Sequence, residues 1–349
     1  MPLNPFWHLF SIKKGGRFPL SPEGKSPHRL VSMNNIHAAI RGRIASAQTI
    51  MITTHLRPDG DAVGSLLGLG LALEGAGKTV QRVSPDGIPS TFRHLPGSAH
   101  VSKKPEALYD LMIAVDCADH TRAGNIFDGL GKPGLNIDHH ITNDNFAEIN
   151  LIEVGQAATC AIIFDHLADW GLALTPDIAS ALLTGIITDT LGFRTTSTTP
   201  HVLRQAADLL ETGVDMHELY LRGLIRKSFN AARYWAAGLS SIQHQDGITW
   251  ATLRLDDRKA SGYTTNDDAD LINHLSAIDD SSVAIIFVEQ HHGRVKVSWR
   301  AQKPGLDVAQ VAQQFGGGGH QAASGAEIAG EMTDVQEKVL TTTRQYLRL

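Results

Sequence analysis

The 349-residue sequence contains only two cysteines, Cys117 and Cys160, and no Cys-x-x-Cys pair. A disulfide framework and a cysteine-ligated zinc site are therefore not expected. The sequence also lacks any run of about 18 uncharged apolar residues, so we expect no transmembrane helix. An excess of basic charge is missing too, because the formal net charge is −5. A protein that coats duplex nucleic acid is usually basic, so any nucleic-acid ligand should be small and held locally.

Histidine, by contrast, is plentiful, with 17 residues in the chain. Imidazole nitrogen suits Mn, Fe, Co and Zn ions, so metal binding is a reasonable expectation. Apolar residues make up 42% and charged residues 19% of the chain, as in ordinary globular proteins. The length allows two domains with sizeable cores. No apolar signal-peptide core follows the first basic residues, and we expect a cytoplasmic protein.

Residues 1–32 differ in composition from the rest of the chain. They contain five Lys or Arg residues and one Glu, a balance of 5 − 1 = +4, together with five prolines and no clear hydrophobic period. We interpret them as a disordered arm or as the product of a misassigned start, with Met33 as the true first residue. A functional basic tail is the alternative.

Apolar runs and helical periods alternate along the first half of the chain. We predict strands at residues 49–54, 79–83, 111–116 and 134–138, and helices at residues 62–74, 157–170, 176–188 and 200–212. Strands that alternate with helices indicate an α/β fold with a mostly parallel sheet and helices on both faces. In such sheets ligands bind beyond the carboxyl ends of the strands.

The second half has a different pattern. We predict a helical connector at residues 214–234, strands at residues 248–253, 283–289 and 294–301, and a short helix at residues 307–315. His291, His292 and Gly293 should form the turn of a hairpin between the last two strands. This pattern indicates a smaller α+β domain at residues 235–349, after the α/β domain at residues 33–213.

Candidate metal ligands begin at the end of the first predicted strand, where His55, Asp59 and Asp61 lie within seven residues on a turn. Pro58 and Gly60 favour a tight turn that brings the three side chains together. A single acid here could simply cap the following helix, as Asp61 could. Three potential ligands together, with more acids at other strand ends, favour a metal site.

Further candidates follow other predicted elements. Asp116 ends the apolar run LMIAV, where an unpaired carboxylate is costly to bury, although it could also cap the next segment. His139 and His140 follow another strand; adjacent histidines point in different directions and should have different roles, unless both are simply exposed. Asp189 ends an apolar helix, where the helix dipole disfavours a carboxylate and a nearby cation would relieve it.

These segments resemble the four motifs of the DHH phosphoesterases: HLRPDGDAVGS (55–65), AVD (114–116), NIDHH (136–140) and GIITDT (185–190). FGGGGH (315–320) is similar to the signature of the DHHA1 domain. The resemblance covers residues 34–349, and its five ordered motifs are highly specific. Arg57 departs from the motif, which often has Asn there; the arginine could contact a phosphate. Among the subfamilies, the chain is most similar to the bacterial nanoRNase and pAp (3′-phosphoadenosine 5′-phosphate) phosphatase group.

The resemblance implies two divalent metal ions, with Mn²⁺ favoured by the oxygen and imidazole donors. One ion would be held by His55, Asp59 and Asp116. The other would be held by Asp61, Asp116, His139 and Asp189, so that Asp116 bridges the two and is essential for catalysis. His140, the second expected catalytic residue, would face the scissile phosphate. Thr159 would support a ligand or simply cap a helix.

The glycine run from Gly316 to Gly319 would let backbone N–H groups approach an anion, unless it is only a flexible linker. The expected substrate-binding residues are Gly317, Gly318, Gly319, His320, Ser298, Arg300 and Arg194. Period-two alternation places Ser298 and Arg300 on one face of their strand. Trp299 should then face the core, with base stacking as the alternative.

The resemblance therefore implies a two-metal phosphoesterase that hydrolyses short oligoribonucleotides, pAp or both. The expected partners are short single-stranded RNA or small nucleotides and no membrane; a homodimer is one option for its assembly. A phosphodiesterase of cyclic or linear dinucleotides is one alternative. A non-catalytic nucleotide sensor on the same scaffold is the other, and the full set of six candidate metal ligands together with His140 speaks against it.

Overall fold

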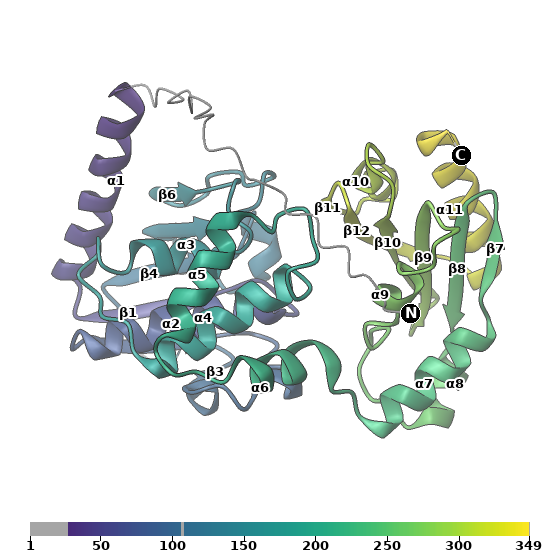
Figure 1. Ribbon diagram of the computed structural model, residues 1–349, viewed down its shortest axis with the longest axis horizontal. Coiled ribbons are helices and arrows are strands. Elements are labelled where there is room, and N and C mark those ends of the chain that lie inside the picture. Colours follow the sequence, from purple (N-terminus) through teal and green to yellow (C-terminus); the bar gives the residue numbers. More distant parts are fainter. Residues whose placement is uncertain (1–26, 106–107, 349) are drawn as a thin grey trace, which may run out of the picture. The chain divides into compact units, whose positions relative to one another are not determined.

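The computed structural model describes residues 27–105 and 108–348, and these form two compact units that divide between Ile225 and Arg226 (Figure 1). The division falls within the predicted connector. Helix α6 (Met216–Tyr220) and the π-helical turn η4 (Leu221–Ile225) belong to the first unit, whereas α7 (Phe229–Ser240) belongs to the second. Residues 1–26 of the predicted arm lie outside the described residues, and residues 27–32 are the start of helix α1 (Pro27–Ser46).

The first unit is built on a parallel sheet of six strands in the order β3-β2-β1-β4-β5-β6. The strands are β1 (Thr49–Thr53), β2 (Thr79–Val83), β3 (Val101–Ser102), β4 (Leu111–Val115), β5 (Leu135–Asp138) and β6 (Ile149–Ile152). The order reverses between β1 and β4, which pair with Met51 opposite Met112. At such a reversal the connections leave in opposite directions, and the carboxyl ends of the two strands flank a ligand site.

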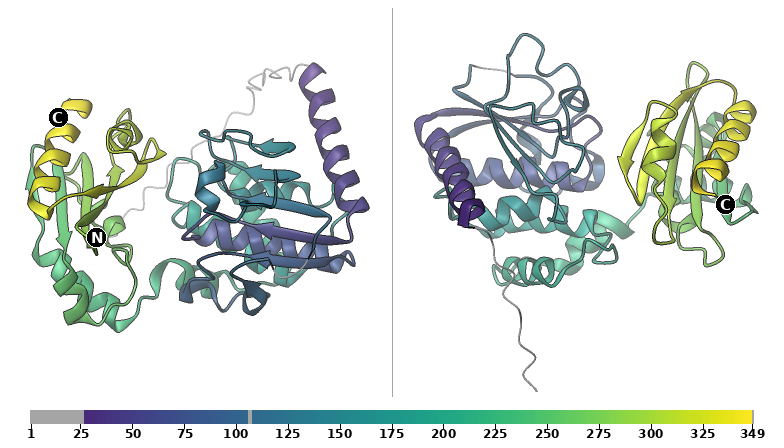
Figure 2. Two further views of the ribbon diagram at one scale, coloured as in Figure 1. Left: turned by 180° about the vertical axis from the view of Figure 1, so that it is seen from behind. Right: turned by 90° about the horizontal axis from the view of Figure 1, so that it is seen from above.

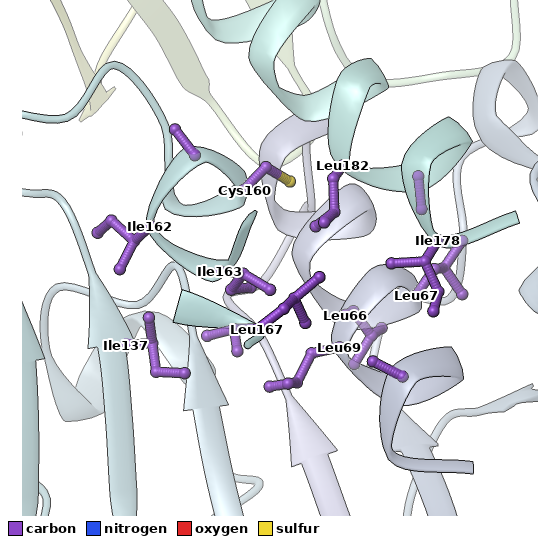
Figure 3. Close-up of a cluster of buried hydrophobic side chains, with 14 of the residues drawn as sticks. Leu66, Leu67, Leu69, Ile137, Cys160, Ile162, Ile163, Leu167, Ile178 and Leu182 are labelled. Carbon is purple, nitrogen blue, oxygen red and sulfur yellow. The ribbon is translucent and has the colours of Figure 1, made fainter. Parts of the chain in front are cut away.

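Helices cover one face of this sheet. They are α1, α2 (Gly60–Gly75), α3 (Thr159–His166), α4 (Pro176–Asp189) and α5 (Pro200–Leu210). Leu66 and Leu69 of α2, Ile163 of α3 and Leu182 of α4 pack with Ile137 of the sheet in one buried cluster (Figure 3). Helix α2 also lies directly against α4, because a Cβ atom at Gly60 would come within 2.2 Å of Thr188 Oγ1.

The prediction of helices on both faces was wrong. The opposite face of the sheet, formed by Met51, Met112 and their neighbours, is covered by irregular segments and the short 3₁₀ helix η3 (His120–Ala123); Ile126 and Phe127 are among the buried residues there. Two further 3₁₀ turns, η1 (Ser90–Phe92) and η2 (Ser98–His100), lie between β2 and β3. Short irregular segments carry no helical period, so sequence periodicity gave no signal for them.

A histidine cluster fixes helix α1 to α3. His37 stacks on His166 with ring centroids 4.0 Å apart, and Trp170 Nε1 donates to His37 Nδ1 at 3.4 Å. His166 Nε2 lies 2.9 Å from Glu153 Oε1, and Nδ1 lies 3.0 Å from Asp169 Oδ2. Because both nitrogens of His166 have carboxylate partners, we assign this cluster a structural role.

The second unit contains a mixed sheet in the order β11-β12-β10-β9-β8-β7, with β8 and β9 parallel and the other neighbours antiparallel. Its strands are β7 (Gln243–Gln245), β8 (Ile248–Leu253), β9 (Val283–Gln290), β10 (Arg294–Ala301), β11 (Gly318–His320) and β12 (Ala323–Ala329). Its other helices are α8 (Leu255–Ser261), α9 (Leu271–Leu275), α10 (Val308–Gln313) and α11 (Met332–Leu347). The sheet of each unit can be followed in the two views of Figure 2.

Apolar side chains cover both faces of this second sheet. Trp299 and Phe287 pack under α10 and α11, whereas Ile286 and Leu253 pack with α7 and α9 on the other side. The predicted hairpin turn between β9 and β10 is present, with Gly293 at φ +63°. None of the helices within the described ranges is long and apolar enough to cross a membrane.

Replacing His166 by glutamine should remove a pH-dependent part of the stability. Burial lowers the pKa of His166, but Glu153 and Asp169 outweigh this and raise it above its ordinary value. A raised folded-state pKa stabilises the protein fully below the unfolded pKa of about 6.5, and this contribution is lost as pH rises through the folded-state value. Urea titrations should therefore show that the stability difference between wild type and His166→Gln shrinks with rising pH. His217→Gln, the same change at an exposed histidine, is the control. If the stability difference between wild type and His166→Gln did not depend on pH, the proposed charge interactions of His166 would be wrong.

Candidate metal centre

The loop from β1 to α2 places His55 and Asp59 beside each other. Asp59 is the N-cap of α2, because its Oδ1 accepts hydrogen bonds from the amides of Asp61 and Ala62 at 3.1 and 3.0 Å. The N-cap of α2 is therefore Asp59 and not Asp61, for which the sequence also allowed this role. The other oxygen of Asp59, Oδ2, lies 3.8 Å from His55 Nε2.

The tautomer of His55 follows from its neighbour. His55 Nδ1 lies 2.8 Å from the carbonyl oxygen of Leu56, which can only accept, so Nδ1 carries a hydrogen. Nε2 therefore faces the carboxylates of Asp59 and Asp116, and this buried atom has no hydrogen-bond partner. A ring held by one nitrogen, with the other aimed at carboxylates, is the usual arrangement of a metal-binding histidine.

Asp61 is fixed by the N-terminus of α3. Its Oδ2 accepts from the amide of Thr159 at 2.7 Å, and its Oδ1 accepts from the amide of Cys160 at 2.9 Å. A helix N-terminus favours a negative charge, so α3 stabilises a carboxylate that is otherwise fully buried. The two hydrogen bonds leave one further lone pair on each oxygen for another ligand.

Asp116 lies at the centre of the group. It follows β4 in a left-handed conformation, φ +53°, which is rare for a residue other than glycine and is concentrated at functional sites. Its Oδ2 lies 3.4 Å from His55 Nε2, whereas its Oδ1 lies 3.7 Å from His139 Nε2 and accepts from the hydroxyl of Thr159 at 3.0 Å. Asp116 thus faces a different histidine with each oxygen. Thr159 supports this candidate ligand and does not cap α3, because the N-cap of α3 is Ala158.

His139 and His140 diverge as predicted, with their rings inclined at 68°. His139 Nδ1 donates to the carbonyl of Gln156 at 3.3 Å, and its Nε2 lies 3.5 Å from Asp189 Oδ2 and 3.9 Å from Asp61 Oδ2. His140 Nδ1 instead donates to Asp138 Oδ1 at 2.7 Å. Asp138 is a residue to which the sequence reasoning gave no role.

Two sets of donor atoms are close enough to surround one metal ion each. They are His55, Asp59 and Asp116, and Asp61, Asp116 and His139, with the donor atoms of each set within 4.8 Å of one another. Asp116 is common to both. Asp189 approaches the second set through His139, and a third set of Asp116, Asp138 and His140 overlaps both.

The carboxylates perturb one another strongly. Burial and the charge of Asp116 raise the pKa of Asp61 to about 7, and burial with the charges of Asp61, Asp59 and Asp116 raises the pKa of Asp189 well above its ordinary value. Burial would lower the pKa of His55, but Asp116 and Asp59 raise it to about 9. Without a cation, Asp61 and Asp189 are therefore harder to ionise than ordinary carboxyl groups.

The residues fit divalent metal ions. Imidazole and carboxylate donors suit Mn²⁺, Fe²⁺, Co²⁺ or Zn²⁺, and Nε2 of His55 is a buried nitrogen without a hydrogen-bond partner. The thiols of the two cysteines are not candidate metal ligands. Cys117 and Cys160 are buried, and burial raises the pKa of both, so they stay protonated.

Two arginines expected near phosphate lie on loops around this edge of the sheet. Arg194 is exposed in the turn after α4, where Leu191 and Phe193 have positive φ angles of 49° and 66°. Arg57 is exposed with φ +54°, and its amide donates to Asp86 Oδ2 at 2.7 Å. No hydrogen bond or ion pair within the described residues joins either guanidinium group to the candidate ligands.

In the second unit, β10 alternates as predicted. Trp299 is buried and donates from Nε1 to Thr343 Oγ1 at 3.1 Å, so it is a core residue. Ser298 and Arg300 point to the other face and are half-buried. Burial lowers the pKa of Arg300, while Asp268 and Asp270 oppose that change.

The glycine run is partly a strand and not an open loop. Gly318, Gly319 and His320 form β11, an exposed end strand that pairs with β12, with Gly319 opposite Ser324. Glycine is required for this close pairing, because a Cβ atom at Gly317 would come within 2.2 Å of the carbonyl oxygen of Gly325. The linker alternative is excluded, and an end strand leaves amides on one edge without a strand partner.

Comparisons with known proteins identify the family. Residues 49–186 match the model of the DHH family, N-terminal domain, and residues 248–348 match that of the DHHA1 domain. A Thermus thermophilus protein named bifunctional oligoribonuclease and PAP phosphatase NrnA is 35% identical over 303 residues, 85% of this chain and 90% of that protein. The chain belongs to the DHH/DHHA1 phosphoesterase family.

Other relatives of this DHH phosphoesterase are more distant. A Bacillus subtilis protein of the same name is 24% identical over 82% of this chain and 91% of its own. The crystal structure of an exopolyphosphatase-related protein from Bacteroides fragilis has a TM-score of 0.82 at 22% identity, covering 90% of this chain and 97% of that one. A RecJ structure from T. thermophilus in complex with Mn²⁺ has a TM-score of 0.50 at 13% identity, over 90% and 54%. The two structures show the shared fold.

Several residues that shape the DHH site were not found from the sequence. Asp138 orients His140, and Asn143 Nδ2 donates to the other oxygen of Asp138 at 2.6 Å. Gln156 fixes His139 through a main-chain carbonyl, for which no side-chain signal exists. The Asp-x-His spacing of residues 138 and 140 was the one visible signal.

Replacing Asp116 by asparagine should impair binding of both metal ions, because each oxygen faces a different set of donors. Calorimetric titration with Mn²⁺ should show both binding events weakened, and hydrolysis should fall more than tenfold, as expected when a shared ligand to two ions is lost. Asp144→Asn, the same change on an exposed loop of the same unit, should change neither. Loss of one binding event with the other unchanged would show that Asp116 does not bridge.

Proposed function

We propose that the chain is a Mn²⁺-dependent phosphoesterase that hydrolyses short oligoribonucleotides and 3′-phosphoadenosine 5′-phosphate. The observation that carries the proposal is the position of Asp116, whose two oxygens face two separate histidine–carboxylate sets. The substrate classes come from the names of the T. thermophilus and B. subtilis relatives. The choice of Mn²⁺ rests on the donor set and on the Mn²⁺ complex of RecJ.

In this proposal His55, Asp59 and Asp116 hold one ion, and Asp61, Asp116, His139 and Asp189 hold the other. Two such ions lower the pKa of a water molecule and neutralise charge on a phosphoryl group. The chain's own contribution is to fix the donors: α3 holds Asp61, and main-chain carbonyls hold the rings of His55 and His139. Thr159 holds the Oδ1 atom of Asp116.

His140 is proposed to contact the scissile phosphate. Burial lowers its pKa, but Asp138 and Asp116 outweigh this and raise it above the ordinary value. Asp138 accepts the hydrogen on Nδ1, so Nε2 is the atom that would donate to a phosphate oxygen when the ring is protonated. A protonated imidazole both binds a phosphate oxygen and can give a proton to a leaving alkoxide.

The DHHA1 unit is proposed to bind the part of the substrate beyond the scissile phosphate. Arg300 and Ser298 of β10, His320 and the glycines of residues 317–319, with Arg194 of the first unit, are the proposed contacts. The alternatives, a dinucleotide phosphodiesterase and a non-catalytic sensor, are distinguished by assay. Purified protein with Mn²⁺ should hydrolyse pAp and a diribonucleotide in preference to a long single-stranded RNA and cyclic di-AMP. A cytoplasmic location and a homodimer stay predictions.

Arg300→Ala should reduce kcat/KM on nucleotide substrates by about 10- to 150-fold, the range for a lost charge-assisted contact of about 1.5–3 kcal/mol. Hydrolysis of bis-p-nitrophenyl phosphate should stay near the wild-type rate, because this ester lacks a distal nucleotide. His140→Ala should impair hydrolysis of both substrates. Arg294→Ala, an exposed arginine on the same strand, is the control and should leave both unchanged. Equal losses for Arg300→Ala on both substrates would refute the role of the DHHA1 unit in substrate selection.

A further inference from the structure

Arg122 is anchored at the same edge of the parallel sheet as the candidate metal ligands. It lies in η3, whose N-cap Asp119 accepts from the amides of Thr121 and Arg122 at 2.8 and 2.9 Å. The carbonyl oxygen of Arg122 accepts from the amide of Leu56 at 2.7 Å. That bond ties η3 to the loop between His55 and Asp59, so the position of Arg122 is fixed relative to the metal site.

A glycine allows this close approach. Gly124 ends η3 with φ +69°, and a Cβ atom there would come within 3.0 Å of the Leu56 side chain. The main chain that carries Arg122 therefore packs directly on the residue next to His55. The local sequence, a capping Asp followed by a short turn and a glycine, is what holds the arginine there.

The guanidinium group of Arg122 lies beside the histidine proposed to contact phosphate. Arg122 Nη1 is 3.4 Å from His140 Nε2, on the side of the ring opposite Asp138. The side chain is exposed, and no carboxylate within the described residues forms an ion pair with it. The nearest acid in the sequence, Asp119, has one oxygen occupied by the two η3 amides and by the Thr121 hydroxyl.

The charge balance of the site calls for such a cation. The four carboxylates Asp59, Asp61, Asp116 and Asp189 and two divalent ions sum to −4 + 4 = 0, so the loaded centre alone offers no net charge to an anion. Asp138 adds a negative charge next to His140. Arginine is always protonated and has only donors, and it binds phosphate through two parallel hydrogen bonds.

We propose that Arg122 is a catalytic residue that binds the scissile phosphoryl group together with His140. Its Nη atoms donate to a non-bridging oxygen of the ester, next to the Nε2 atom of His140. This inference rests on the proposed phosphoesterase function but not on which nucleotide is the substrate. It separates the roles of two arginines: Arg122 acts at the scissile phosphate, whereas Arg300 acts on the remainder of the substrate.

The test compares Arg122→Ala, Arg122→Lys and a matched control, Arg204→Ala, which changes an exposed arginine on α5. Calorimetry with Mn²⁺ should show unchanged metal binding in all three. Inorganic phosphate, titrated into the Mn²⁺-loaded protein, should bind Arg122→Ala at least about 10- to 150-fold more weakly, the range for each lost hydrogen bond to a charged group. Arg122→Lys, which keeps the charge but loses the planar fork, should fall between the alanine variant and wild type.

Activity provides the second measurement. Arg122→Ala should lose a similar factor in kcat/KM on bis-p-nitrophenyl phosphate and on pAp, in contrast to Arg300→Ala, and added guanidinium ion should restore part of it. Wild-type phosphate affinity in a folded Arg122→Ala protein would overturn the proposal, because it would leave only a structural role. If wild type cleaves the small ester but no nucleotide, the proposed substrate is wrong, while the comparison on the small ester still decides the role of Arg122.

Discussion

Mutual repulsion among Asp59, Asp61, Asp116 and Asp189 is the constraint around which the first unit is arranged. Burial and like charge raise the pKa of Asp61 and of Asp189, so these two carboxyl groups are harder to ionise when no cation is bound. The fold brings these acids together because β1 and β4 are neighbours at the reversal of strand order, and because α2 packs on α4. Burial of the apolar core beneath the acids supplies the free energy that offsets their mutual repulsion. Metal binding would reduce that repulsion.

Main-chain groups hold most of the candidate metal ligands in place. These hydrogen bonds explain how several carboxylates can be buried close together. The amides of Thr159 and Cys160 bind Asp61, and the carbonyls of Leu56 and Gln156 set the tautomers of His55 and His139. Backbone groups carry no titratable charge and lose little entropy on binding. The site is therefore organised before an ion arrives, which favours tight and specific coordination.

The sequence was sufficient to predict β1, β2, β4 and β5 of the first unit, and polar candidate ligands follow three of these apolar runs: His55 after β1, Asp116 after β4 and His139 after β5. It missed the short edge strands β3 and β6. It could not predict the cover of the second face of the sheet, since η3 and residues 123–127 have no period. It named Asp61 as a possible cap of α2 in place of a metal ligand, because either acid has a capping side chain and only the turn geometry selects Asp59. In the second unit the short strands β7 and β11 and the longer β12 were missed; in β12, ASGAEIA combines small residues with weak strand preference.

Arg122 illustrates the same limit at the site itself. Its sequence context, a short polar turn between two strands, is indistinguishable from a surface loop, and nothing in the spacing relates it to His140. The relation arises only because β4 and β5 are neighbours, so that the segments leaving their carboxyl ends meet, and because Leu56 N holds the carbonyl of Arg122. Because the role of Arg122 depends on which strands are neighbours, it can be recognised only in the structure. The metal ligands were found from the sequence because they lie at or next to the ends of strands and helices. The phosphate-binding cation had to be found by asking which charged side chain beside them has no ion-pair partner among the described residues.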